Sequence, residues 1–451
     1  MLRTANEAAD VVWERDLLGR VLAETVNGRT TAYAYDATGR RTRRTTPSGH
    51  TSTWTYDPTG SPRALTADGG TLTFTHDAAG RETERATGAV TLIQRWDKTD
   101  RLTAQTVSSS SAEHLLQHRT YAYRPDGYVT EVRELTTGTS HFDLDPVGRV
   151  TGVQAHGWTE TYAYDTAGNQ THATAPDHPA PGDREHTGTL IRHAGRTAYE
   201  HDAAGRLIRK TRTWTYTWNA ADRLTAATTP TGDQWTYAYD PLGRRISKTG
   251  PAGISLTFIW DATRLAEQTT QAGATTTWDY APGTHRPLTQ IHRDPLVTEP
   301  RFHTIVTDLT GTPTELITLD GDVAWQPRTT LWGTALSSPP DSLSCPLRFP
   351  GQYADLESGL NYNYFRYYDP ETARYLTPDP LGLDPAPNHH TYVHTPHTRI
   401  DPLGLDGHEW ADPNDVNFSQ RTVSPNDYAE KDEQWRMGLD SVGKCTEGNR
   451  S

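Results

Sequence analysis

A unit of about twenty residues, repeated along most of the chain, constrains the fold more than any other feature of the sequence. Its core is aromatic-x-aromatic-Asp-x-x-Gly-Arg, and the clearest copies span residues 33–40 (YAYDATGR) and 237–244 (YAYDPLGR). From Asp16 to Asp97 the centres of the copies are 20, 21, 20 and 20 residues apart. A fixed period of this length indicates stacked supersecondary units. Related copies centre on Asp16, Asp57, Asp77, Asp97, Asp126, Asp145, Asp165, Asp202, Asp222 and Asp261.

One repeat has the pattern of a β-hairpin. Tyr33 and Tyr35 are two positions apart, so both lie on the same face of a strand. Asp36 to Gly39 has turn chemistry, because an Asp side chain bonds to its own backbone and a Gly accepts a positive φ. A single hairpin cannot bury its aromatic face, so neighbouring hairpins must stack. We therefore expect an all-β fold of antiparallel strands over most of residues 13–380, in which the repeated Asp and Arg are structural.

Composition restricts the classes of protein to which this chain can belong. The net charge of −13 argues against a nucleic-acid-binding surface on the repeats. No stretch of eighteen apolar residues is present, so we expect no membrane-spanning helix. Cys345 and Cys445 form no disulfide or metal-binding framework, and we expect neither a metal nor a cofactor. A secreted or cell-surface protein is compatible with this composition, although the first sixteen residues lack a signal-peptide layout.

The stretch from Asp379 to Leu405 begins and ends with the same five residues, DPLGL. Its two aspartates, Asp379 and Asp401, are 22 positions apart and have matched surroundings. Two carboxylates that share a site cannot both ionise easily, so one can act as an acid while the other activates a water molecule. This is the chemistry of an aspartyl protease. The spacing alone also fits a purely structural interpretation, because Asp-Pro and Leu-Gly are common in turns.

Three motifs in this part of the chain resemble the conserved core of Rhs/YD-repeat proteins, a family of large toxin carriers. They are residues 348–353 (RFPGQY), residues 365–370 (FRYYDP) and the two DPLG copies, which eighteen residues separate. In that family the last pattern marks a self-cleaving aspartyl protease. The resemblance therefore implies that Asp379 and Asp401 are catalytic. It also implies that the chain is cut between Leu405 and Asp406.

The repeats themselves resemble YD repeats over residues 13–285. Periodicity alone does not distinguish a propeller, a solenoid and a closed shell, whereas YD repeats wind a β-sheet into a hollow shell. The resemblance implies a shell over residues 1–300, a core with the protease over residues 301–405 and a variable toxin segment over residues 406–451. The repeats are few for a full carrier, so both a closed and an open shell are compatible with the sequence. The implied partners are the C-terminal segment as cargo, an immunity protein and secretion machinery.

Two positions before the first aspartate bear on the site. Arg366 precedes Asp379 by thirteen residues. A guanidinium near a pair of carboxylates would lower a carboxylate pKa and could hold the scissile strand, whereas pairing with Asp369 is the alternative. Ala373 stands where family members usually have Gly. If that turn needs a positive φ, the Ala costs about 1 kcal/mol.

The interval between the two aspartates is rich in histidine. A metal site would use such residues, but their spacing fits no known zinc pattern and no Cys joins them. We therefore expect them to be surface loop residues. They are His389, His390, His394 and His397.

The sequence changes character after Leu405. Residues 406–451 hold ten acidic and five basic residues and lack the aromatic repeat. Residues 426–437 have a helix-forming composition, so we expect a tail that is α-leaning or irregular. Residues 415–424 resemble the opening of ParB-like toxin domains, whose later catalytic residues are absent. So short a segment rarely forms an active enzyme alone, and we expect a shortened toxin segment without activity of its own.

Two functions of different classes fit these observations. The first is a toxin carrier whose β-shell encloses its C-terminal cargo and releases it by one intramolecular cut. The second is a non-catalytic cell-surface or wall-associated protein whose Trp- and Tyr-rich repeats bind glycans or partner proteins. The paired aspartates and the change of composition at Leu405 favour the carrier, because a surface-binding protein needs neither feature.

Overall fold

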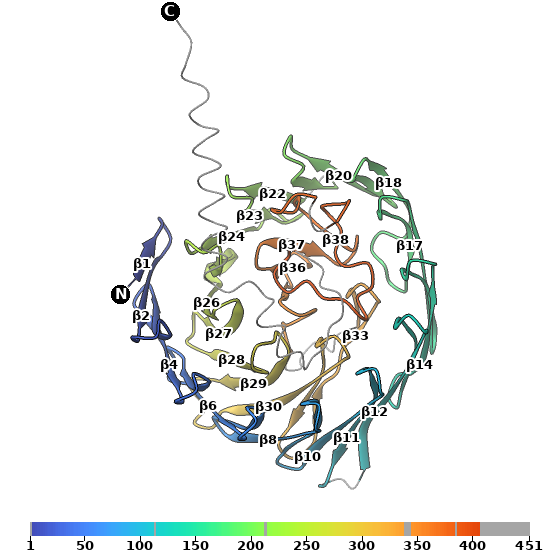
Figure 1. The fold of residues 1–451 in the computed structure, drawn as a ribbon. Coiled ribbons are helices and arrows are strands. Elements are labelled where there is room, and N and C mark those ends of the chain that lie inside the picture. The colour runs from blue at the N-terminus through green and yellow to red at the C-terminus, as the bar shows by residue number, and fades with distance from the viewer. Residues whose placement is uncertain (1, 112–113, 212–213, 338–343, 384–385, 406–451) are drawn as a thin grey trace, which may run out of the picture.

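The computed structural model is a long antiparallel β-sheet that winds around a smaller inner core (Figure 1). The structure describes residues 2–111, 114–211, 214–337, 344–383 and 386–405. Within these ranges each strand from β1 to β32 pairs antiparallel with its neighbours in sequence. Tyr33 and Tyr35 are both half-buried and alternate with exposed residues along their strand, as one shared face requires. The predicted all-β fold of repeat hairpins is therefore confirmed.

The strands of the long sheet are short and follow one another closely. The first half comprises β1 (Leu2–Ala5), β2 (Asp10–Arg15), β3 (Val21–Val26), β4 (Arg29–Tyr35), β5 (Arg41–Thr45), β6 (Thr51–Tyr56), β7 (Pro62–Ala67), β8 (Gly70–His76), β9 (Glu82–Thr87), β10 (Val90–Trp96), β11 (Leu102–Ser109), β12 (His114–Tyr123), β13 (Val129–Glu134), β14 (Gly138–Leu144), β15 (Val150–Ala155) and β16 (Trp158–Tyr164). The second half comprises β17 (Gln170–Thr174), β18 (Gly182–Thr187), β19 (Leu190–Ala194), β20 (Thr197–His201), β21 (Leu207–Lys210), β22 (Trp214–Trp218), β23 (Leu224–Thr228), β24 (Gln234–Tyr239), β25 (Arg245–Thr249), β26 (Ser255–Asp261), β27 (Arg264–Thr270), β28 (Thr275–Tyr280), β29 (Pro287–Arg293), β30 (Arg301–Thr307), β31 (Pro313–Thr318) and β32 (Val323–Trp325), with a short 3-10 helix η1 (Pro251–Gly253) before β26.

Each repeat turn uses the chemistry that its sequence predicts. In the turn after β4, Asp36 Oδ1 accepts hydrogen bonds of 3.0 Å from the N–H groups of Thr38 and Arg40. Gly39 in the same turn has a φ of 91°. The strand pairing shifts register at Tyr35, just before the turn, which is a β-bulge, and the same shift precedes the turns after β6, β8 and β16. Bulges increase the local twist of a strand, so their repetition curls the sheet.

The repeated Arg links each hairpin to the next one. Arg149 donates to Asp145 Oδ2 at 2.7 Å in its own turn and to the Asp165 carbonyl in the next turn at 3.0 Å. Its guanidinium lies 4.9 Å from the centre of the Tyr164 ring, and the Tyr164 hydroxyl donates to the Val150 carbonyl at 2.9 Å. These contacts hold neighbouring turns together, so the repeated Asp and Arg are structural. The same carbonyl and ring contacts recur at Arg20, Arg40 and Arg81.

The two ends of the winding overlap, and strands near the N-terminus lie against β24–β31 (Figure 1). Buried and partly buried ion pairs join the two layers across more than 200 residues of sequence. We call this contact the seam. Its pairs are Glu24–Arg244, Arg29–Glu267, Arg41–Asp261, Arg44–Asp261, Arg44–Asp279 and Glu82–Arg286.

The inner core follows the long sheet in sequence and lies inside the winding (Figure 1). It contains a two-stranded sheet, β33 (Arg328–Thr329) and β34 (Ala335–Ser337), and a four-stranded antiparallel sheet. The latter comprises β35 (Tyr353–Asp355), β36 (Leu360–Asn363), β37 (Arg366–Asp369) and β38 (Arg374–Tyr375). Rings of the wall pack on rings of this sheet, for example Tyr239 on Tyr362 at 6.3 Å and Tyr237 on Tyr367 at 5.9 Å. The wall therefore positions the inner core through buried aromatic contacts.

The long sheet continues to Trp325, so its hydrogen bonding does not break at residue 300. The division into domains at residues 300 and 405 stays a prediction. The tail of residues 406–451, with the helix expected there and Cys445, lies outside the described residues. Over the part of the chain that the structure describes, no helix is long and apolar enough to cross a membrane.

Candidate active site

The four-stranded sheet of the inner core carries the arginine of the site. Arg366 is the first residue of β37, directly after a two-residue turn formed by Tyr364 and Phe365. Tyr364 has a φ of 49°, which is unusual for a bulky residue. The Phe365 N–H donates to the Leu403 carbonyl at 3.0 Å, so this turn is fastened to the second DPLGL segment. Backbone strain of this kind persists where surrounding contacts over-determine the conformation.

The two aspartates occupy equivalent places in two matched turns. Asp379 Oδ1 accepts from the Leu381 N–H at 2.8 Å, and Asp401 Oδ1 accepts from the Leu405 N–H at 2.9 Å. Each Oδ1 atom thus stabilises its own turn, as the structural interpretation of the motif predicts. Each Oδ2 atom instead contacts a residue outside its own turn.

Both Oδ2 atoms meet the same nitrogen of Arg366. The Nη2 atom lies 2.7 Å from Asp379 Oδ2 and 3.3 Å from Asp401 Oδ2. All three side chains are buried, with exposed fractions of 3% to 4%. The structure therefore brings together Asp379, Asp401 and Arg366, and the described ion pairs of Arg366 are with these two aspartates and not with Asp369.

The segment that ends at Leu405 is held against this group. Arg366 Nε donates to the Gly404 carbonyl at 2.5 Å. Gly404 has a φ of 70°, and a Cβ atom there would lie 2.7 Å from the Asn363 carbonyl oxygen. A side chain at position 404 would therefore disrupt the approach of the chain to β36. Leu405 is buried with 8% exposure, which places the predicted scissile residue inside the core, whereas Asp406 lies outside the described residues.

Sequence reasoning did not identify two polar residues that contact Asp401. The Tyr375 hydroxyl lies 2.7 Å from Asp401 Oδ2. Asn363 Nδ2 donates to the Tyr375 hydroxyl at 2.7 Å and to the Asp401 carbonyl at 2.8 Å. The Arg366 guanidinium lies 3.7 Å from the centre of the Tyr375 ring. Tyr375 reaches Asp401 because β37 pairs with β38, and sequence spacing does not show that pairing.

Two expectations about the neighbouring residues have clear outcomes. Ala373 has a φ of 56°, so this turn does adopt the conformation that favours Gly. The assignment of all four histidines to the surface is wrong for His390, which is only 1% exposed and contacts the Gly205 carbonyl at 3.2 Å. Burial lowers the pKa of His390 to about 2, so its ring is neutral. The described residues contain no group of three or more His, Cys, Asp or Glu that could hold a metal.

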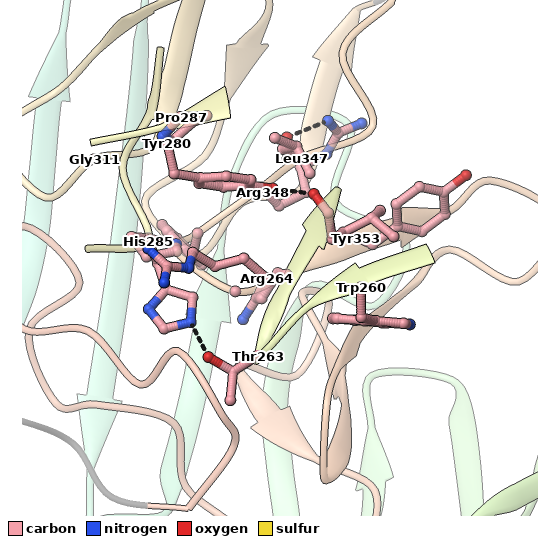
Figure 2. Close-up of a pocket in the computed structure, with 15 residues that line it drawn as sticks. Trp260, Thr263, Arg264, Tyr280, His285, Pro287, Gly311, Leu347, Arg348 and Tyr353 are labelled. Carbon is pink, nitrogen blue, oxygen red and sulfur yellow. Dashed lines mark hydrogen bonds between the residues drawn. The ribbon is translucent and has the colours of Figure 1, made fainter. Parts of the chain in front are cut away.

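A separate pocket lies where the wall meets the start of the inner core (Figure 2). Its cavity has a volume of about 20 Å³, which is enough for about one water molecule. Arg264 and Arg348 line it, and burial lowers the pKa of both guanidinium groups. Figure 2 shows His285 bonded to Thr263, at 3.1 Å. None of the described lining residues is acidic.

Fold and site together define a class of protein: a wound β-shell of hairpin repeats whose inner core carries two buried aspartates on one arginine. The chain belongs to the teneurin YD-shell family, because the family model described as Teneurin YD-shell matches residues 83–393. A second model, described as RHS Repeat, matches residues 15–51. The suspected relationship to Rhs/YD-repeat proteins is thereby confirmed.

Curated relatives are Rhs proteins and toxins. The probable deoxyribonuclease RhsB of Dickeya dadantii (strain 3937) is 33% identical over 313 residues, which cover 64% of this chain and 21% of the relative. The double-stranded DNA deaminase toxin A of Burkholderia cenocepacia (strain H111) is 29% identical over 328 residues, covering 64% of this chain and 22% of the relative. The chain thus spans less than a quarter of the length of these relatives.

Solved structures share the fold. The crystal structure of TcdB2-TccC3 aligns with a TM-score of 0.75 and 19% identity, covering 90% of this chain and 24% of that one. The crystal structure of TcdB2-TccC3-Cdc42 aligns with a TM-score of 0.74 and 18% identity, covering 89% and 24%. At this identity the likeness establishes the shell architecture alone.

Proposed function

We propose that this chain is part of an Rhs-type toxin carrier, and that it cuts itself once between Leu405 and Asp406. The observation that carries the proposal is that Asp379 and Asp401 both contact Arg366. Asp401 lies four residues before Leu405, at the predicted cut. The matched turns explain how this arrangement arises, because each Oδ1 atom holds its turn and leaves Oδ2 for the shared site.

In the proposed reaction the two carboxyl groups share one proton. The ionised group takes a proton from a water molecule as the water oxygen bonds to the Leu405 carbonyl carbon. The protonated group donates to the developing oxyanion. The bond between that carbon and the Asp406 nitrogen then breaks, and the nitrogen leaves as an amine with the proton that the first group took from water. The new carboxyl group at Leu405 returns a proton to the second group. Arg366 holds the Gly404 carbonyl, so it keeps the scissile segment in place.

Intramolecular placement supplies much of the acceleration. A well-oriented reacting group lowers a barrier by roughly 7–11 kcal/mol compared with a free encounter. Here the Leu403 carbonyl, the Gly404 carbonyl and the Leu405 N–H are each bonded to the core. The site cuts its own chain and is then spent, so it turns over once.

The cargo of the carrier is the chain beyond Leu405. Relatives whose names specify a toxin, such as the DNA deaminase toxin of Burkholderia cenocepacia, support this assignment. A released cargo implies an immunity protein in the producing cell and a route of export to the cell surface or beyond. The inner core lies inside the winding, which suits a protein that processes an enclosed segment (Figure 1).

The cleavage is tested with Asp379→Asn and Asp401→Asn in the full chain, incubated near neutral pH. Each change keeps the shape of the side chain but removes the exchangeable proton. We expect wild type to give a fragment whose first residue is Asp406, and both variants to remain intact by mass. Asp145→Asn is the matched control, because Asp145 caps a repeat turn and pairs with its own Arg149.

Sequencing of the new N-terminus is essential, because Asp-Pro bonds also break in hot acid. A folded wild type that stays intact, or Asn variants that still cut after Leu405, would overturn the proposal. The non-catalytic surface protein, with repeats that bind glycans or partner proteins, would then be the better interpretation.

A further inference from the structure

We propose that Tyr375, held by Asn363, is a positioning residue that keeps Asp401 ionised so that Asp401 serves as the base of the cleavage. This inference rests on the proposed self-cleavage and assigns separate roles within it. It starts from the hydrogen bonds that end on Asp401: Oδ1 accepts from the Leu405 N–H at 2.9 Å, and Oδ2 faces Tyr375 at 2.7 Å and Arg366 at 3.3 Å.

The direction of the hydrogen bond between Tyr375 and Asp401 follows from its neighbours. The Asp401 backbone carbonyl can only accept, so the Asn363 atom 2.8 Å from it is the amide nitrogen. The same nitrogen donates to the Tyr375 oxygen at 2.7 Å. That hydroxyl therefore uses its proton toward Asp401 Oδ2. A donor of this kind stabilises a carboxylate more than a protonated carboxyl group, because the charged oxygen is the stronger acceptor.

This donor offsets an imbalance that Arg366 creates. The arginine lies closer to Asp379 than to Asp401, at 2.7 Å and 3.3 Å, and would by itself favour the negative charge on Asp379. The Tyr375 hydroxyl acts on Asp401 and favours the charge there. Asp401 is also the aspartate bonded to the Leu405 N–H, so it is the better placed of the two to activate water beside the Leu405 carbonyl.

The tyrosine keeps its own proton in this environment. Burial, together with the neighbouring Asp401 carboxylate, holds the pKa of Tyr375 well above its usual value. The charged and titratable groups that face Asp401 are Arg366 from β37, Tyr375 from β38, Asp379 from the loop after β38 and Tyr392 from the following loop. Tyr392 likewise has its pKa raised by burial and by Asp401, so both hydroxyls keep their protons.

The test compares Tyr375→Phe with Tyr368→Phe in the full chain. Tyr368 pairs directly with Tyr375 across β37 and β38, and its hydroxyl donates to the Trp332 carbonyl at 3.0 Å, away from the carboxylates. The control thus loses a buried hydroxyl from the same sheet without touching Asp401. Denatured protein is diluted into refolding buffers from pH 4 to pH 9, and the appearance of the fragment is followed by intact mass.

We expect the acidic limb of the pH–rate profile to shift to higher pH by about one unit in Tyr375→Phe. The variant loses a hydrogen bond that favours the charged form of Asp401, so a higher pH is needed to form the base. The fragment then forms about ten-fold more slowly on the acidic side of the profile and nearly normally at alkaline pH. A difluorotyrosine at position 375, which is a stronger donor, should move the same limb downward. Tyr368→Phe should leave it in place.

An unchanged profile in both Tyr375 variants, with wild type cleaving and Asp401→Asn inactive, would overturn this inference and leave the proposed function intact. A uniform loss of rate at every pH in Tyr375→Phe would also overturn it, since that is the effect of a merely structural residue. If wild type does not cleave at all, the proposed function itself fails.

Discussion

The seam and the inner core contain the same arrangement of charges with different surroundings. In each, two buried aspartates meet one buried arginine: Asp261 and Asp279 meet Arg44 in the seam, as Asp379 and Asp401 meet Arg366 in the core. The exposed fractions of these side chains are all between 2% and 5%. Burial and a shared arginine therefore do not by themselves distinguish a structural pair from a reactive one.

The additional partners make the difference. In the seam, Arg41 pairs with Asp261 at 2.6 Å and His50 lies 3.6 Å from Asp279. Although burial opposes it, the surrounding cations lower the pKa of both aspartates, so both stay ionised. Neutral hydroxyls donate at both sites, to Asp279 from Ser52 and Thr289 and to Asp401 from Tyr375, so the difference lies in the second cation. The described partners of Asp401 besides Arg366 are this hydroxyl and a backbone N–H. A carboxylate stabilised by neutral donors can exchange a proton more readily than one held by two cations.

The largest effect is expected for Arg366→Met. This variant leaves two buried carboxylates without their shared cation, which costs about 3–5 kcal/mol of folding free energy. It also removes the contact that holds the Gly404 carbonyl, so we expect no fragment. Intact mass and the midpoint of thermal unfolding measure the two effects. Arg366→Lys is the control, because it keeps the positive charge but lacks the planar guanidinium group. Cleavage at the wild-type rate in Arg366→Met would contradict the proposed role of Arg366.

The matched change in the seam is Arg44→Met. It removes one cation from two buried aspartates, and we expect a similar loss of about 3–5 kcal/mol in stability. Folded molecules of this variant should still cleave, because the described hydrogen bonds of the Arg44 side chain go to Asp261, Asp279 and the Trp278 carbonyl in the wall. Loss of cleavage in a folded Arg44→Met protein would show that the seam contributes to the reaction.

The sequence predicts the hairpins because their causes are local. An Asp caps its own turn, a Gly supplies the positive φ and an Arg four residues after the Asp closes the pair, all within one repeat. The seam is different, since Glu24 and Arg244 are 220 residues apart and nothing in either repeat identifies its partner. Their meeting depends on how far each bulged hairpin turns the sheet, which only the assembled winding determines.

The candidate site was predictable in part for the same reason. The two DPLG turns are local motifs, so their spacing points to both aspartates, and the resemblance adds the cut. Tyr375 acquires its role from the pairing of β37 with β38, and Asn363 from the turn that docks the second motif. His390 was assigned wrongly because its burial depends on β20 and the turn after it, which are remote in sequence.

A smaller effect on folding stability is expected from the titration of His50 in the seam. Burial disfavours the charged ring, but hydrogen bonds with Asp279 and Asp68 outweigh it and raise the pKa of His50 above its usual value. The stabilisation from His50 is therefore full below about pH 6.5 and is lost as the pH rises through the higher folded pKa. We expect the urea midpoint of wild type to fall from pH 6 to pH 8.5, and His50→Gln to weaken this dependence. An equal fall in both proteins would exclude His50 as its source.

The smallest effect is expected at the repeat turns, where one Asp meets one partly exposed Arg. Arg149 is 22% exposed and Asp145 is 14% exposed, so water screens their attraction and the pair contributes about 1 kcal/mol or less. Arg149 also donates to the Asp165 carbonyl and packs on Tyr164, contacts that a lysine at this position would not reproduce. We therefore expect Arg149→Lys to lose nearly as much stability as Arg149→Ala, with cleavage unchanged in both. If Arg149→Lys matched wild type in its thermal midpoint, charge alone would explain the pairing of turns that recurs along the wall, and the carbonyl contact to the next hairpin would contribute nothing.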